Sequence, residues 1–75
     1  MNEKELAAAA LRLGELVAAR RKSFDATQQD LADLAEVSRR SISALESGKT
    51  TTRLDIVLRV LAALGIDVVH AIENR

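Results

Sequence analysis

The strongest constraint on this chain is that it is short and that neither a disulfide nor a zinc site can stabilise its fold. Its 75 residues include no cysteine and one histidine. Disulfides are therefore excluded, and we expect no metal site of ordinary zinc-ligand type. A chain of this length buries only about 60–65% of the surface that its unfolded form exposes, so its core is thin. We expect its stability to come from helix packing and self-association.

The composition is that of a folded helical protein. Hydrophobic residues make up 48% of the chain, charged residues 29%, and there is no proline. Alanine, leucine, glutamate and arginine, all good helix formers, are abundant. The apolar runs are too short to span a membrane, and the mixed charge of the first five residues does not fit a signal peptide. The sequence predicts one cytoplasmic domain over residues 1–75.

Turn and capping signals divide most of the chain into four helices. Thr27 and Asp30 form an acidic variant of the capping box before the second helix, and Ser38 is an N-cap candidate for the third. Gly48 and Gly65 stand where glycine usually ends a helix. The expected helices cover about residues 2–22, 28–35, 39–47 and 53–64.

In two of these helices, the apolar residues extend beyond a single stripe along the helix. In the first, Gly14 allows a close helix crossing. In the fourth, Ile56 and Val60 form a second apolar stripe, for which a dimer contact is favoured over ordinary over-packing. The apolar face of the first helix consists of Leu6, Ala10, Leu13 and Val17, widened by Leu16.

The last segment changes its period from helical to alternating. It is rich in β-branched residues, which predicts a strand over about residues 66–72. A single strand has no partner within a helical chain, so its unpaired backbone groups predict pairing with a second copy across a two-fold axis. The expected dimerisation residues are Ile66, Val68, Val69, His70 and Ile72.

The net charge is zero, but the charges are unevenly spread. The stretch 37–59 holds five basic and two acidic residues, so neutrality does not exclude a nucleic-acid partner. Within it, a helix that begins Ser38-Arg39-Arg40-Ser41 follows another short helix after a tight turn, which is the build of a helix-turn-helix. The second helix of that motif enters the major groove, where arginine can bond guanine through two donors.

Residues 27–49, TQQDLADLAEVSRRSISALESGK, resemble the Cro/repressor type of helix-turn-helix, the Xre family, in order and without gaps. The resemblance extends over about residues 11–65, with the motif itself at about 27–48. It implies an all-α, lambda-repressor-like four-helix domain. Residues 53–69 look, more loosely, like the HipB-like antitoxin branch, in which a C-terminal β-strand completes the dimer.

The resemblance also implies roles for individual residues. Two arginines read bases, a serine lies one turn further, a glutamine bonds the DNA backbone and braces the recognition helix, and a capping serine and the following loop touch phosphates. The implied DNA-binding residues are Gln28, Ser38, Arg39, Arg40, Ser43, Lys49 and Thr50.

Two positions depart from the family pattern. Glu36 and Asp25 stand where the family usually has glycine. Glu36 falls in a turn that often needs a positive φ, so strain and a looser or differently shaped turn are expected there. Aspartate tolerates that conformation better than most residues. Glu36 and Asp33 also place acidic charge near the DNA side, which would weaken binding.

These features predict a homodimeric, sequence-specific repressor that binds a palindromic operator in double-stranded DNA. The HipB-like resemblance implies an antitoxin that binds a HipA-like kinase toxin and represses its own operon. Two alternatives stay open: a protein-interaction module whose DNA binding is incidental, and a stand-alone phage-type repressor. No Ser/His/Asp order, phosphate loop, metal cluster or cofactor motif is recognisable, so we expect neither an enzyme nor a cofactor.

Overall fold

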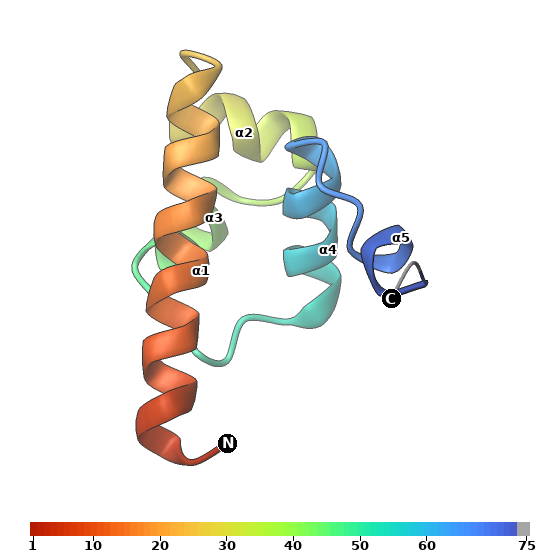
Figure 1. The fold of residues 1–75 in the computed structure, drawn as a ribbon. Helices are drawn as coiled ribbons and strands as arrows, with labels where there is room; N and C mark the ends of the chain where they lie inside the picture. The colour runs from red at the N-terminus through yellow and green to blue at the C-terminus, as the bar shows by residue number, and fades with distance from the viewer. Residues whose placement is uncertain (74–75) are drawn as a thin grey trace.

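The computed structural model describes residues 1–73, and all of its regular elements in that range are α-helices (Figure 1). The first four agree with the expected helices to within one residue at each end, so that prediction is confirmed. The five helices are α1 (Glu3–Ser23), α2 (Gln28–Ala35), α3 (Arg39–Glu46), α4 (Leu54–Ala63) and α5 (Val68–Glu73).

The predicted C-terminal strand is wrong, because most of that segment forms α5. Gly65 takes a positive φ of 77° and ends α4. Asp67 then starts a new helix, since its carboxylate accepts the His70 backbone N–H at 2.8 Å. The valines of the segment belong to this helix, so they need no neighbouring strand. An antiparallel ribbon between two copies is therefore not a feature of this fold.

The core lies where α2, α3 and α4 meet the C-terminal half of α1. Val60 is fully buried in it and Ile56 packs against it, so the expectation that this stripe forms a dimer contact is wrong for Val60. Small Ala32, also fully buried, allows the close approach of α2 and α3. The buried apolar residues are Val17, Leu31, Ala32, Ala35, Ile42, Leu45, Val60, Leu61 and Leu64.

Gly14 makes the close helix crossing that the sequence predicts. A Cβ at this position would lie 2.5 Å from the Leu45 carbonyl oxygen and 2.6 Å from that of Glu46. Both atoms belong to the backbone at the end of α3, which cannot swing aside like a side chain. The spacing of α1 and α3 therefore depends on glycine here.

Capping side chains begin the two helices of the motif. The Thr27 hydroxyl accepts the Asp30 N–H at 3.0 Å, and the Asp30 carboxylate accepts the Thr27 N–H at 2.9 Å. The latter bond lowers the pKa of Asp30. At α4 the N-cap is Arg53, whose side chain makes no capping bond.

None of the described helices is both long and apolar enough to cross a membrane.

Candidate nucleic-acid interface

The outward face of α3 carries the residues expected to meet DNA. Ile42 and Leu45 are buried beneath the helix, while Arg39 and Arg40 are exposed and Ser43 is half-exposed. Ser47, exposed immediately after α3, shares this face because it follows Arg40 by seven residues. Sequence reasoning missed Ser47, although the spacing from Arg40 through Ser43 to Ser47 could have identified it.

Ser38 holds the N-terminus of α3 in place. Its hydroxyl accepts the Ser41 N–H at 3.0 Å and lies 2.9 Å from the Ser41 hydroxyl. The predicted cap is thus confirmed. Ser38 is itself exposed, beside the first turn of α3, where backbone N–H groups and the helix dipole favour an anion.

The turn between α2 and α3 keeps its shape without glycine. Glu36 takes the left-handed conformation, with φ of 58°, as the departure from the family pattern suggests. Its N–H donates to the Asp33 carbonyl at 3.3 Å, and the Val37 N–H donates to the Ala32 carbonyl at 3.0 Å. Asp25 likewise has φ of 55°. Both turns are therefore formed, and the expected looseness of the Glu36 turn is not seen.

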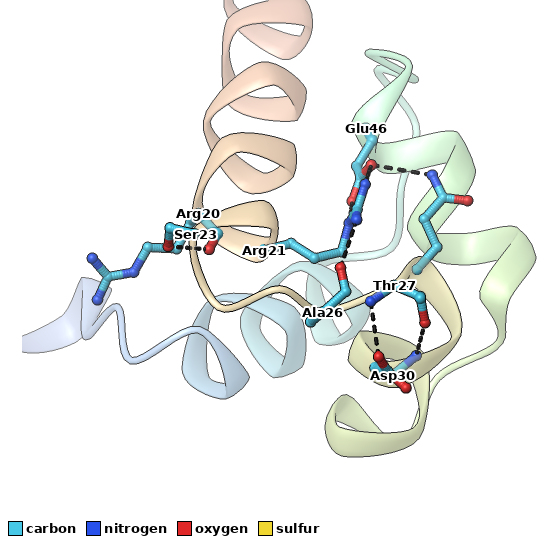
Figure 2. A network of polar contacts seen from close by, with 8 residues as sticks. Arg20, Arg21, Ser23, Ala26, Thr27, Asp30 and Glu46 are labelled. Carbon is cyan, nitrogen blue, oxygen red and sulfur yellow. Dashed lines mark hydrogen bonds and ion pairs between the residues drawn. The ribbon is translucent and has the colours of Figure 1, made fainter.

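A buried polar clamp joins α1, α2 and α3 (Figure 2). The Arg21 guanidinium donates two bonds to the Glu46 carboxylate, at 2.7 and 2.9 Å, and a third to the Ala26 carbonyl at 2.8 Å. The Gln28 side-chain amide donates to the same carboxylate at 3.1 Å. Gln28 thus touches the end of α3, as the bracing role requires.

Burial makes this clamp electrostatically important. Arg21 is 8% exposed. The bond from Arg21 lowers the pKa of Glu46, against burial, which raises it, and the bond from Gln28 lowers it further. The bond to Glu46 raises the pKa of Arg21. Both groups stay charged at neutral pH, so the clamp is an ion pair within the domain.

The sequence alone does not reveal this role of Arg21. In sequence, the run Arg20-Arg21-Lys22 is typical of cations at a helix C-terminus, which the helix dipole favours. Arg21 follows Gly14 and Val17 at helical spacing, however, and therefore belongs to the buried face of α1. Glu46 lies next to Leu45 in α3. Charged residues of opposite sign on two facing apolar stripes are the signal that could have identified the pair.

The loop after α3 adds a second group of polar residues beside the recognition helix. Lys49 and Thr50 are exposed there. Arg53 also lies in this region and was not among the predicted site residues; its guanidinium bonds the Asp55 carboxylate at 2.9 Å. A cavity of about 110 Å³ in this loop is lined by Ser41, Ala44, Lys49, Thr51, Thr52, Arg53 and Ile56.

The three predicted cations on this surface are available for a ligand. Among residues 1–73, the side chains of Arg39, Arg40 and Lys49 make no hydrogen bond or ion pair with the protein. Two arginines at the start of an exposed helix and a lysine in the following loop can therefore bond an anion without first breaking an internal contact.

The predicted dimerisation residues lie apart from this surface. Figure 1 shows α5 beyond α4, separated from α3 by that helix. Val68 packs against the core, whereas Val69 and Ile72 are 59% and 63% exposed. Val68 and Val69, but not Ile72, line a groove of about 420 Å³ beside α4. Its lining residues are Leu58, Leu61, Ala62, Gly65, Ile66, Asp67, Val68 and Val69.

Comparison with known proteins agrees with this geometry. A helix-turn-helix family model matches residues 17–70. An uncharacterized HTH-type transcriptional regulator, y4mF of Sinorhizobium fredii (strain NBRC 101917 / NGR234), is 42% identical over 65 residues, which cover 84% of this chain and 86% of the relative. The chain therefore belongs to the Xre/Cro-type helix-turn-helix family of DNA-binding transcriptional regulators, a family without enzymatic activity.

Proposed function

We propose that the protein is a sequence-specific transcriptional repressor that acts in the cytoplasm as a homodimer on a palindromic operator. The observation that carries this proposal is the exposed pair Arg39 and Arg40 at the start of α3, without internal partners among the described residues. Each guanidinium can donate to O6 and N7 of a guanine in the major groove. Ser43, and Ser47 beyond it, are short enough to let the helix approach the bases.

Phosphate contacts would supply the rest of the affinity. Gln28 uses one amide N–H on Glu46 and retains a second donor for a phosphate oxygen. Ser38 comes directly before α3 in the chain, and Lys49 and Thr50 follow it. Ser38, Lys49 and the Thr50 backbone would bind the phosphates of the two DNA strands that border the groove. Arg53 can join them if it releases Asp55, an exchange that costs little because the pair is exposed.

The homodimer would form through the α4–α5 surface. Val69 and Ile72 leave large apolar side chains in water, and the groove beside them is mostly apolar. A second copy is the occupant we propose, because a two-fold axis there leaves both copies of α3 uncovered for half-sites about 34 Å apart. Val68 and His70 of α5, and Ile66 in the link before it, would lie in or beside this contact.

We also propose an antitoxin role, in which the dimer binds a HipA-like kinase toxin and represses its own operon. The resemblance of residues 53–69 to the HipB-like branch supports it. A kinase-like reading frame beside the gene, and its co-purification with this protein, are the expected findings. A solitary gene or phage neighbours would favour the stand-alone repressor instead.

Fluorescence anisotropy tests the DNA-binding proposal. Wild type should prefer DNA from upstream of its own gene over scrambled DNA and should bind more weakly at roughly 200 mM than at roughly 50 mM salt. An Arg39→Ala/Arg40→Ala variant should lose this preference, at about 1–3 kcal/mol for each guanine contact.

Arg12→Ala is a matched control, since it removes an exposed arginine from α1 and should leave the preference intact. If wild type binds neither DNA at low salt, the repressor proposal fails and the protein-interaction alternative takes its place.

A further inference from the structure

The N-terminal half of α1 is apolar but lies outside the core. Residues 6–11 read LAAAAL, six apolar residues in succession. Five of them are exposed and Ala10 is half-exposed, while the buried residues of α1 begin only at Gly14. Figure 1 shows this end of the helix extending past the other helices. A helix that is apolar on most sides is normally covered by another element.

Its apolar residues form a seam with coiled-coil spacing. Leu6, Ala9, Leu13 and Leu16 are separated by three, four and three residues, the pattern of successive a and d positions. Leu6 is 41% and Leu16 58% exposed. The fold thus uses Leu13 and Val17 of the predicted apolar face for the core and leaves the rest of the seam uncovered.

A groove runs beside this seam and provides room for side chains of a second helix. Its volume is about 270 Å³. One wall is formed by Leu6, Ala9 and Leu13, and the residues opposite include Leu45, Lys49, Thr50 and Val57. Gly14 touches α3 from another side of α1. A helix docked on the seam would therefore leave the outward face of α3 open, and it would lie beside Lys49 and Thr50 of the following loop.

We infer that this seam pairs antiparallel with α1 of a second copy, as a self-association surface separate from α5. Charge complementarity identifies the occupant. Glu5 and Arg12, both exposed, lie one heptad apart on the same flank of the seam. An antiparallel copy sets each beside the opposite charge of the other. Small Ala9 stands on the seam near the midpoint between them, where the two helices would approach most closely.

Antiparallel pairing also sets helix dipoles head to tail, whereas parallel pairing would set like ends together. One carboxylate oxygen of Glu5 accepts the Asn2 backbone N–H at 3.1 Å, and the other remains for Arg12 of the second copy. With α5 as one two-fold contact and this seam as another, dimers would associate further into larger assemblies.

The absence of native cysteine allows a direct test by disulfide trapping. Ala9→Cys, on the seam near the expected axis, should give a disulfide-linked dimer on mild oxidation, because the two Cα atoms would come within about 7 Å. Ala8→Cys is the matched control. Ala8 is also exposed but points away from the seam, so it should remain mostly reduced.

Both variants should be tested with Ile72→Ser, which removes an apolar side chain from the proposed α5 contact. Trapping of Ala9→Cys should persist in that background, and Leu6→Glu/Leu16→Glu should abolish it with unchanged circular dichroism. Arg12→Glu should reduce it about tenfold or more in rate, and more than Arg12→Gln does. Equal trapping at Ala8 and Ala9, or none at Ala9, would overturn the inference.

Dependence of the trapping on an intact α5 would overturn it as well, since the seam would then not be a separate surface. DNA anisotropy on the same variants distinguishes this failure from failure of the repressor proposal, because the seam substitutions leave Arg39 and Arg40 intact.

Discussion

The two ends of this small domain are held together in opposite ways. At the junction of α1, α2 and α3, the buried Arg21 and Glu46 bond each other, and Gln28 donates to Glu46. At the α4–α5 end, Val68 packs against the core, while Val69 and Ile72 face water. The first end thus buries a pair of charged side chains, whereas the second end exposes apolar side chains to solvent.

This contrast separates the tasks of the two ends. A buried bidentate ion pair fixes the relative orientation of two elements, because both partners need a defined geometry. Loss of one partner leaves an unpaired charge in the interior. That suits the junction that orients the recognition helix. Apolar surface left in water provides free energy for association, which suits the end distant from α3. The following predictions test this division, beginning with the largest expected effect.

The Glu46→Ala substitution should break the junction. It leaves the Arg21 guanidinium buried without its partner, so we expect the free energy of unfolding to fall by about 3–5 kcal/mol, measured by urea denaturation. Asp55→Ala is the control, since it removes the carboxylate of an exposed pair and should change stability by about 0–1 kcal/mol. Equal effects of the two substitutions would contradict the role given to the clamp.

Acid should weaken the same junction without a mutation. The folded-state pKa of Glu46 is lowered, so its contribution is complete above the unfolded-state pKa, about 4.3. It is lost as the pH falls through the lowered folded value. Urea denaturation from roughly pH 7 to roughly pH 2.5 should show this decline. Asp30, whose pKa is also lowered, contributes in the same direction. Glu46→Gln should remove part of the decline, and an unchanged pH profile would argue against it.

Gly14→Ala should destabilise the junction through its backbone contact. Alanine favours a helix by about 1 kcal/mol over glycine, yet the added Cβ would meet the Leu45 and Glu46 carbonyl groups of α3. We expect a net loss of about 1–3 kcal/mol in thermal denaturation. Ala8→Gly, in the exposed half of the same helix, should lose about 1 kcal/mol from propensity alone. A gain in stability from Gly14→Ala would show that the crossing is not close.

Glu36→Gly should stabilise the turn of the motif. It relieves a left-handed residue with φ of 58°, which costs roughly 1 kcal/mol for a non-glycine residue. The contact of Glu36 with Arg59, at 3.7 Å between exposed side chains, offsets little of this. Asp25→Gly should act in the same direction but less, because aspartate tolerates that conformation better. A loss of stability in Glu36→Gly would indicate that the Glu36 side chain stabilises the fold by more than the strain of its conformation costs.

Ile72→Ser should have the smallest effect on the fold and a clear one on assembly. The side chain is largely exposed, so unfolding of dilute monomer should shift by no more than about 0.5 kcal/mol. Sedimentation should show weaker dimerisation of the variant. Leu34→Ser, on exposed α2 surface, is the control that should leave both quantities unchanged. A stable, unchanged dimer in Ile72→Ser would move the proposed contact away from α5.

Local signals predicted most of the fold, because they act within a few residues. Thr27, Ser38 and Gly48 mark helix ends through bonds or conformations that neighbouring residues satisfy. The segment after Gly65 could not be read in this way, since alternating β-branched residues suit a strand only if another strand is present. Asp67 was the missed signal, because it caps a helix at the position where a strand was expected.

The exposed residues of the candidate site could be predicted from the sequence, but the buried ion pair that holds α3 in place could not. Arg39 and Arg40 follow directly from the motif and lie on the outward face of α3. The bond from Arg21 to Glu46 joins residues 25 positions apart and depends on how α1 and α3 are packed. Arg53 was missed because its place beside α3 results from the path of the loop.

The contact at Gly14 has a consequence for motion. Most helix pairs meet through side chains, whose torsions let the axes shift as rotamers change. Here a Cα lies directly against two backbone carbonyl groups, and neither partner has a side-chain torsion to adjust. The depth to which α3 can project from the domain is therefore limited by bond lengths and van der Waals radii. It should vary little with temperature while the surrounding side chains rearrange.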